Sequence, residues 1–177
     1  MKEIFSLYNQ IEIGQNETCK KCFKANLENN FKLSRPISIW LKASNIIQDK
    51  PKILFVGKTA RGDNKFIGEL QNDMFRDASK LGKHLFENSS WAYWAYTREI
   101  VKKVYGSLED GLKNTSFTNL IKCNNSDSKD KTINETKSFC LNDLQIFWKE
   151  LEVIKPDKVI FYTNNDYDDF ISKYKRI

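Results

Sequence analysis

The sequence has few of the residues that mark linkers, secreted domains or membrane spans. Its 177 residues include only seven glycines, three prolines and four cysteines. No stretch rich in glycine, proline or serine divides the chain, and no internal repeat is present, so we expect one domain over residues 1–177. No apolar run approaches the ~18 residues that a membrane span needs, which predicts no membrane partner.

The N-terminal segment lacks the uninterrupted apolar stretch of a signal peptide. Glu3, Asn9 and Glu12 interrupt its few apolar residues. We therefore expect a cytoplasmic protein. In such a reducing compartment, a Cys-x-x-Cys pair more often binds a metal ion or cluster than forms a disulfide.

Basic residues outnumber acidic ones, but few of them are arginines. The chain has 29 Lys and Arg against 23 Asp and Glu, a formal net charge of +6. This balance favours contact with a polyanion such as DNA or RNA, although mixed charges are also typical of an ordinary solvated surface. Only five of the basic residues are Arg, so few side chains are available to read bases in a groove by paired hydrogen bonds.

Three short apolar runs have the pattern of strands that are buried on both faces, at residues 52–57, 117–122 and 158–163. Helical patterns lie between and beside them, at residues 73–87, 91–106 and 134–154, the last with Asn134 as its N-cap. Strands that alternate with helices predict an α/β fold, here a three-layer α/β/α sandwich with a mainly parallel central sheet. Ligands of such sheets bind at the carboxyl ends of the strands, so the candidate site follows Val56 and includes Asn119–Cys123.

The four cysteines form one close pair, Cys19 and Cys22, and one wide pair, Cys123 and Cys140. Four thiolates are the number that an all-cysteine zinc site or a 4Fe-4S cluster requires. The alternative is that the wide pair consists of small buried apolar side chains and the close pair lies at the surface. The spacing leaves iron and zinc both open.

The aromatic segment WAYWAY, residues 91–96, suggests a stacking platform for single-stranded nucleic acid. At helical spacing, however, Trp91, Trp94 and Ala95 share one face. We expect that face to pack on the sheet as part of the core.

Several motifs follow one another in a recognisable order: CKKC from Cys19, ILFVG ending at Gly57, KFIG at residues 65–68, TNLIKC at residues 118–123, and the segment from Cys140 to Pro156. Their order and spacing resemble the uracil-DNA glycosylase superfamily, in particular its iron-sulfur branches, called families four and five. The resemblance covers roughly Cys19 to Thr163. It implies DNA as the partner, hydrolytic excision of uracil or another deaminated base, and a 4Fe-4S cluster, or alternatively zinc, on Cys19, Cys22, Cys123 and Cys140.

The resemblance also implies a base-binding role for Gly57, Phe66 and Asn119. Phe66 would stack on the base, and the Asn119 amide would pair with a carbonyl and the ring N–H of uracil. Gly57 permits close approach of the main chain to the base or to a developing oxyanion. The structural alternatives are that Phe66 packs under its loop and that Asn119 caps a turn.

The sequence departs from the family at the catalytic positions. Lys58 replaces the family's Glu, which is associated with positioning a water, and a protonated lysine is no base. Asp63 is the nearest carboxylate that could orient water, although a solvated loop aspartate near Arg61 is the alternative. The family's C-terminal His-containing loop has no counterpart, because the only histidine, His84, lies in a helical pattern where we expect a surface position.

Three hypotheses remain open. The first is an enzyme, a uracil-DNA glycosylase-like protein that hydrolyses N-glycosidic bonds. The second is a catalytically inactive module of the same fold that contains the metal cluster and binds nucleic acid, a nucleotide or a protein partner. The third is a small α/β protein with only a structural zinc on its four cysteines.

Overall fold

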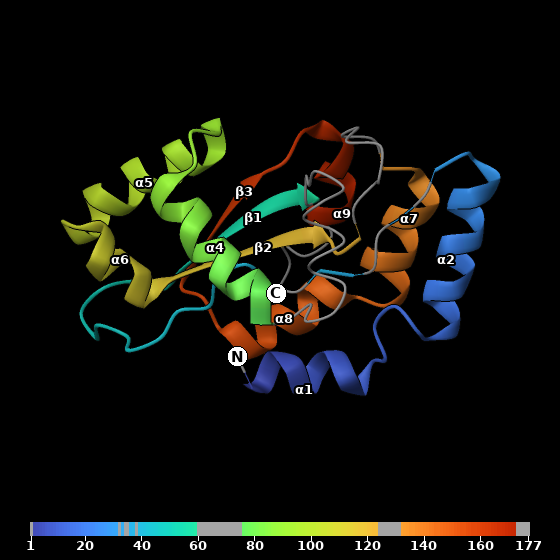
Figure 1. The fold of residues 1–177 in the computed structure, drawn as a ribbon, viewed down its shortest axis with the longest axis horizontal. Coiled ribbons are helices and arrows are strands. Elements are labelled where there is room, and N and C mark those ends of the chain that lie inside the picture. The colour runs from blue at the N-terminus through green and yellow to red at the C-terminus, as the bar shows by residue number, and fades with distance from the viewer. Residues whose placement is uncertain are drawn as a thin grey trace.

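The computed structural model describes residues 2–31, 33, 36–37, 39–59, 76–123 and 132–172. Three strands form a parallel sheet in the order β2-β1-β3: β1 (Ile53–Thr59), β2 (Thr115–Ile121) and β3 (Lys158–Tyr162). Each corresponds to a predicted strand, and the predicted α/β class with a parallel sheet is confirmed. Figure 1 shows the carboxyl ends of β1 and β2 pointing toward α2 (Glu17–Glu28) and α7 (Asn134–Ser138).

The central strand is buried on both faces. Leu54, Phe55 and Val56 are fully inaccessible to solvent, which explains the continuous apolar run without polar alternation. Phe55 packs into one core cluster, whereas Leu54 and Val56 pack into a second cluster on the opposite face.

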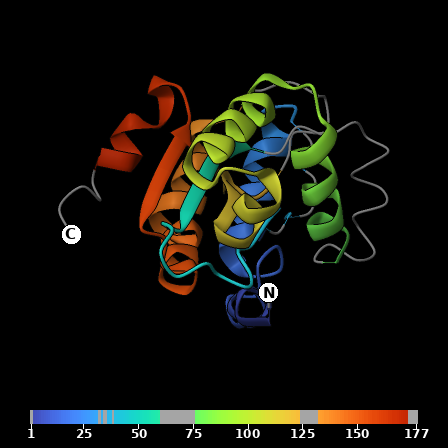
Figure 2. The ribbon, with the colours of Figure 1, turned by 90° about the vertical axis from the view of Figure 1, so that its left-hand side faces the viewer.

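Three helices, α4 (Arg76–Asn88), α5 (Ala92–Tyr105) and α6 (Leu108–Asn114), lie on one side of the sheet (Figure 2). Phe86 of α4 and Trp94 of α5 pack against Phe117 of β2. α5 ends as predicted, because Gly106 adopts a left-handed conformation with φ 88° and its N–H bonds to the Lys102 carbonyl.

The opposite face is covered by the π-helical turn η1 (Phe139–Asp143), α8 (Ile146–Ile154), the 3₁₀ turn η2 (Asn165–Tyr167) and α9 (Asp168–Ser172). The short helix α7 (Asn134–Ser138) leads into η1 and lies beside α2. Leu141, Phe147 and Tyr167 from these elements pack against Leu54 and Val56. Core side chains from helices therefore lie on both faces of the sheet, and the three-layer sandwich stays a prediction for the whole chain.

The single helix predicted over residues 134–154 is wrong, because the chain forms three consecutive pieces. The Leu144 N–H bonds to the Phe139 carbonyl, five residues back, at 3.0 Å, which gives a π turn. Gln145 then takes a left-handed conformation with φ 54° and separates this turn from α8. The predicted cap is also wrong by one residue, since Ile133 is the N-cap and Asn134 is the first helical residue.

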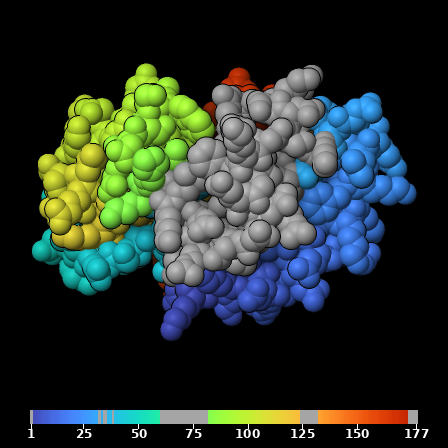
Figure 3. Space-filling view, in the orientation of Figure 1, coloured from blue at the N-terminus to red at the C-terminus, as the bar shows by residue number. Residues whose placement is uncertain are grey.

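Two N-terminal helices, α1 (Lys2–Gln10) and α2 (Glu17–Glu28), were not predicted. α1 packs against α8 through Ile4, Tyr8 and Ile146. α2 begins at Asn16, whose side chain accepts a hydrogen bond from the Cys19 N–H at 2.8 Å. In the space-filling view, α1 and α2 (blue) lie on the side of the molecule away from α5 and α6 (Figure 3).

None of the helices in the described ranges is long and apolar enough to cross a membrane. The polar stretch at residues 124–134, whose composition predicts a surface loop, lies mostly outside the described residues.

Candidate functional site

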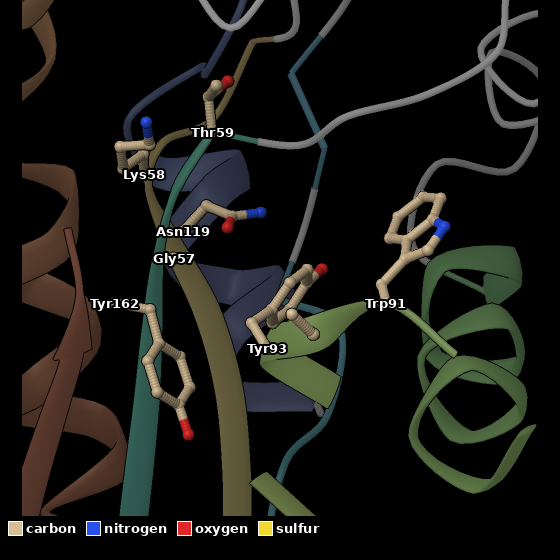
Figure 4. Close-up of a pocket in the computed structure, with 8 residues that line it drawn as sticks. Gly57, Lys58, Thr59, Trp91, Tyr93, Asn119 and Tyr162 are labelled. Atoms are coloured by element: carbon tan, nitrogen blue, oxygen red, sulfur yellow. The ribbon is translucent and has the colours of Figure 1, made fainter. Parts of the chain in front are cut away.

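A cavity of about 560 Å³ opens at the carboxyl ends of the strands. This volume is within the range of small-molecule sites, about 300–1,000 Å³. The residues that line it come from the three strands and from the start of α5: Gly57, Lys58, Thr59, Trp91, Ala92, Tyr93, Asn119 and Tyr162 (Figure 4). The cavity therefore lies where ligands of open parallel sheets bind, and it includes two of the three predicted base-binding residues.

Gly57, Asn119 and Tyr162 lie in one row across the sheet. Gly57 pairs with Asn119 of β2 on one side and with Tyr162 of β3 on the other. A Cβ atom at position 57 would collide with the Asn119 side-chain oxygen. The missing side chain of Gly57 thus leaves room for the Asn119 amide, which is only 7% exposed.

Aromatic rings form much of the cavity wall. The rings of Tyr93 and Tyr162 are 6.3 Å apart, and those of Tyr93 and Trp91 are 6.4 Å apart. The Thr97 hydroxyl lies 3.1 Å from the Tyr162 hydroxyl and fixes it, and burial raises the pKa of Tyr162, so this group is neutral at pH 7. Figure 4 shows that these rings and the Asn119 amide border the same space.

The prediction for WAYWAY is right for Trp94 and wrong for Trp91. Trp94 is fully buried in the core, whereas Trp91 is 45% exposed and lines the cavity. Trp91 precedes the first residue of α5 and acts as its N-cap, so it does not follow the helical spacing that places Trp94 on the buried face.

Of the two predicted catalytic residues, Lys58 lies in the described part of the chain and Asp63 does not. Lys58 contributes to the cavity lining, but its amino group points away from Tyr93 and Trp91 (Figure 4), as expected from side-chain alternation after Gly57 on β1. Asp63 and Phe66 lie outside the described residues. Among the described residues that line the cavity, none is a carboxylic acid.

His84 is exposed on α4, as expected, and its ring nitrogen lies 3.3 Å from the Asn88 amide nitrogen, one turn along the same helix.

The four cysteines are all buried and all free of disulfides. Cys19 and Cys22 lie one turn apart on α2, Cys123 follows β2, and Cys140 lies on the π turn η1. Burial raises the pKa of the Cys140 thiol from 9.0 to about 12, with the nearby thiols of Cys22 and Cys19 as further causes. Burial also raises the pKa of Cys123, and all three other thiols add to that shift. The two pairs, about a hundred residues apart in sequence, are therefore within electrostatic reach of each other.

Polar groups of the fold surround the sulfurs. The Gly14 N–H donates to the Cys19 sulfur at 3.1 Å, and the Asn26 side-chain amide donates to the Cys22 sulfur at 3.7 Å. The main-chain N–H of Lys122 hydrogen-bonds to Cys140 and lowers its pKa. Such donors stabilise a thiolate and orient it toward a metal centre.

Four cysteine thiols are the number that either a 4Fe-4S cluster or an all-cysteine zinc site needs. In the described part of the chain, no three histidine, cysteine or acidic side chains are grouped so as to hold a metal ion. Iron and zinc both accept four thiolates. The buried position of all four thiols does not fit the alternative in which CKKC is a surface pair.

The cavity and the cysteines are directly linked. The Thr59 hydroxyl, on the cavity wall, donates to the Cys123 carbonyl at 2.9 Å. Asn119 lies on β2, four residues before Cys123, which follows the end of that strand. The cysteine site therefore abuts the end of the cavity formed by β1 and β2.

A buried ion pair lies behind Asn119. The Lys122 ammonium is 2.6 Å from the Glu150 carboxylate, and the two side chains are 1% and 0% exposed. Thr118 and Tyr8 also donate to this carboxylate. Burial raises the pKa of Tyr8, and the Glu150 carboxylate raises it further, so the Tyr8 hydroxyl remains a donor.

Sequence reasoning missed Tyr93 and Tyr162 on the cavity wall and the pairing of Lys122 with Glu150. Tyr162 falls at the end of a predicted strand, so the rule that ligands bind at the carboxyl ends of strands could have found it. Glu150 gave a weaker signal, as an acidic residue among the apolar positions of an amphipathic helix.

No protein-family model matches this chain, and no curated protein shows significant similarity to it.

Proposed function

We propose that this chain is a uracil-DNA glycosylase-like protein that binds uracil or another deaminated base of DNA in the cavity and excises it. The observation that carries the proposal is the Asn119 amide, held against Gly57 and bordered by the rings of Tyr93, Tyr162 and Trp91.

This arrangement suits a flat heterocycle with donors and acceptors on its edge. Aromatic walls offer stacking faces, and stacking on an aromatic side chain contributes about 1–3 kcal/mol per base. An amide offers one acceptor and two donors, and thus matches a base edge that carries a carbonyl beside a ring N–H. Together these contacts would recover the few kcal/mol needed to extrude a base from DNA.

We also propose that the four cysteines hold a 4Fe-4S cluster and that this cluster has a structural role. The cluster would tie α2 to the end of β2 and to η1, and so contribute folding free energy. It would also hold the strand end that carries Asn119.

A second candidate function, base binding without excision, is favoured by one observation. The described cavity lining has no carboxylate to position a water, and Lys58, at the place of the family's glutamate, directs its amino group elsewhere. A general base typically contributes about 10²–10⁴-fold to a rate. A chain without such a group would retain recognition and lose turnover.

One experiment separates the two functions. Protein purified without oxygen, with its iron content recorded, is mixed with single- and double-stranded oligonucleotides that contain one uracil. Strand cleavage after alkali measures excision, and fluorescence anisotropy measures binding. Excision that is lost in Asn119→Ala supports the enzyme, whereas uracil-dependent binding without cleavage supports the binding module.

The matched control is Asn88→Ala, which removes the same side chain from an exposed position on α4. It should bind and cleave as the wild type does. Equal affinity for uracil and thymine oligonucleotides in the iron-loaded wild type would refute the proposed base recognition.

A further inference from the structure

The Lys122 ammonium has three protons and three acceptors within hydrogen-bonding distance. It donates to the Thr118 hydroxyl at 2.7 Å, to the Asn119 main-chain carbonyl at 2.6 Å and to the Glu150 carboxylate at 2.6 Å. With a side chain only 1% exposed, Lys122 is satisfied entirely by protein groups.

The hydrogen bond from the Lys122 ammonium to the Asn119 carbonyl lies at the outer edge of the sheet, on the side of β2 away from β1. Phe117 of β2 pairs its main-chain N–H and carbonyl with Leu41, on the side away from β1. Main-chain groups of a strand repeat their direction every two residues, so the Asn119 carbonyl points the same way. There the Lys122 ammonium takes the place of a neighbouring strand's N–H, and the strand that carries the Asn119 amide is fixed at that residue.

Burying the charges of Lys122 and Glu150 costs free energy, which indicates that this ion pair has a role besides stability. Replacing a buried ion pair by apolar residues is often neutral or stabilising, so the pair is poorly explained by stability alone. Lys122, one partner of the pair, also donates a hydrogen bond to the main-chain carbonyl of Asn119, which lines the cavity. The Glu150 carboxylate of α8 accepts a hydrogen bond from the ammonium, and the Tyr8 hydroxyl of α1 donates to the same carboxylate.

We propose that Lys122 is a positioning residue of the cavity: its ammonium anchors the Asn119 main-chain carbonyl and thereby orients the amide that recognises the base. This inference rests on the proposed function for its ligand, but the geometry of the anchor does not depend on that ligand. Lys122 is not among the described residues that line the cavity, so its ammonium acts on a bound base through the main chain of Asn119.

The test uses the full chain with its iron content matched between variants, because Lys122 also hydrogen-bonds to Cys140 through its main chain. Binding is measured by anisotropy on a fluorescein-labelled single strand with one uracil. Lys122→Met should raise Kd roughly tenfold, which corresponds to about 1.4 kcal/mol. It should also destabilise the fold, because it leaves the Glu150 carboxylate buried without a partner.

A double variant separates positioning from stability. Lys122→Met with Glu150→Gln removes both charges and keeps an acceptor for Tyr8, so the melting temperature should rise above that of the single variant. The affinity should stay reduced, because the Asn119 carbonyl still lacks its donor. Affinity that recovers together with the melting temperature would overturn the proposal.

Tyr8→Phe is the matched control. It removes a donor to the same Glu150 carboxylate but leaves Lys122 and Asn119 in place. It should lower the melting temperature and leave Kd within about twofold of the wild type. An equal loss of affinity in Tyr8→Phe would show that any damage to this buried network has the same effect, and would refute a specific role for Lys122.

A readout without ligand distinguishes failure of this inference from failure of the proposed function. The crystal structure of ligand-free Lys122→Met should show the Asn119 amide displaced from Gly57 or in two orientations. An Asn119 amide that keeps its wild-type place would overturn the inference. If the wild type binds no oligonucleotide, the proposed function fails, and this structure still decides the role of Lys122.

Discussion

The substitution Gly57→Ala tests the central contact of the cavity with a single methyl group. The new Cβ would collide with the side-chain oxygen of Asn119, whereas its next neighbour, Phe117 Cζ, would be at 3.6 Å, an ordinary contact distance. Only the end of the Asn119 side chain must move. We therefore expect a loss of stability near the low end of the range for overpacking, about 1 kcal/mol.

The effect on base binding should be larger. A displaced amide loses two hydrogen bonds to the base edge, each with a net value of about 1 kcal/mol. The sum of about 2 kcal/mol corresponds to an increase in Kd of about 30-fold. The assay is anisotropy on the single strand with one uracil, with the melting temperature recorded for the same sample.

A double-mutant cycle identifies the cause. In an Asn119→Ala background the methyl group at position 57 meets no amide, so Gly57→Ala should then leave Kd unchanged. The two substitutions should therefore be strongly non-additive. Independent, additive losses would refute the explanation that Gly57 acts by making room for Asn119.

Three further predictions follow from the described contacts. Cys22→Ser should remove bound iron and lower the melting temperature by about 5 °C or more, or about 2 kcal/mol for a chain of this size; unchanged iron content and melting temperature would contradict the cluster. Trp91→Ala should weaken binding of the uracil strand about tenfold by loss of stacking, while Tyr96→Ala, which removes an exposed aromatic ring of α5 that does not line the cavity, should not. Because the pKa of Tyr8 is raised in the folded state, its hydroxyl keeps its proton at a pH where the hydroxyl of the unfolded chain has already ionised. The contribution of Tyr8 to the free energy of unfolding is therefore complete below pH ~10 and decreases above it. In urea titrations from pH 8 to 11, Tyr8→Phe should therefore lose less stability with rising pH than the wild type, and equal slopes would contradict this assignment.

The sheet could be predicted because its signal is local. The run ILFVG is apolar without alternation, as a strand covered on both faces requires. β2 is buried along its whole length although it contains polar residues, whereas β3 has no buried residue, so the predicted burial on both faces is wrong for β3. The pairing of Gly57 with Asn119 and Tyr162 could not be predicted, because it depends on the register between strands far apart in sequence. For this reason the glycine and the amide were assigned through a resemblance, and Tyr162 was missed.

The break in the predicted C-terminal helix had no signal in the hydrophobic pattern. Leu141, Leu144 and Phe147 continue a helical repeat across the π turn and across the left-handed Gln145. Apolar spacing indicates which residues are buried but not where the backbone changes its hydrogen-bond pattern, and here Leu144 packs into a different core cluster from Leu141 and Phe147. The break changes where Cys140 lies relative to α8, which only the three-dimensional structure shows.

The most direct test of the account is a crystal structure of the chain with a single-stranded oligonucleotide that contains one uracil. The account predicts the uracil within the cavity, beside the rings of Tyr93 and Tyr162, with its edge within about 2.7–3.2 Å of the Asn119 amide. A uracil bound elsewhere on the protein, with the cavity unoccupied, would contradict it.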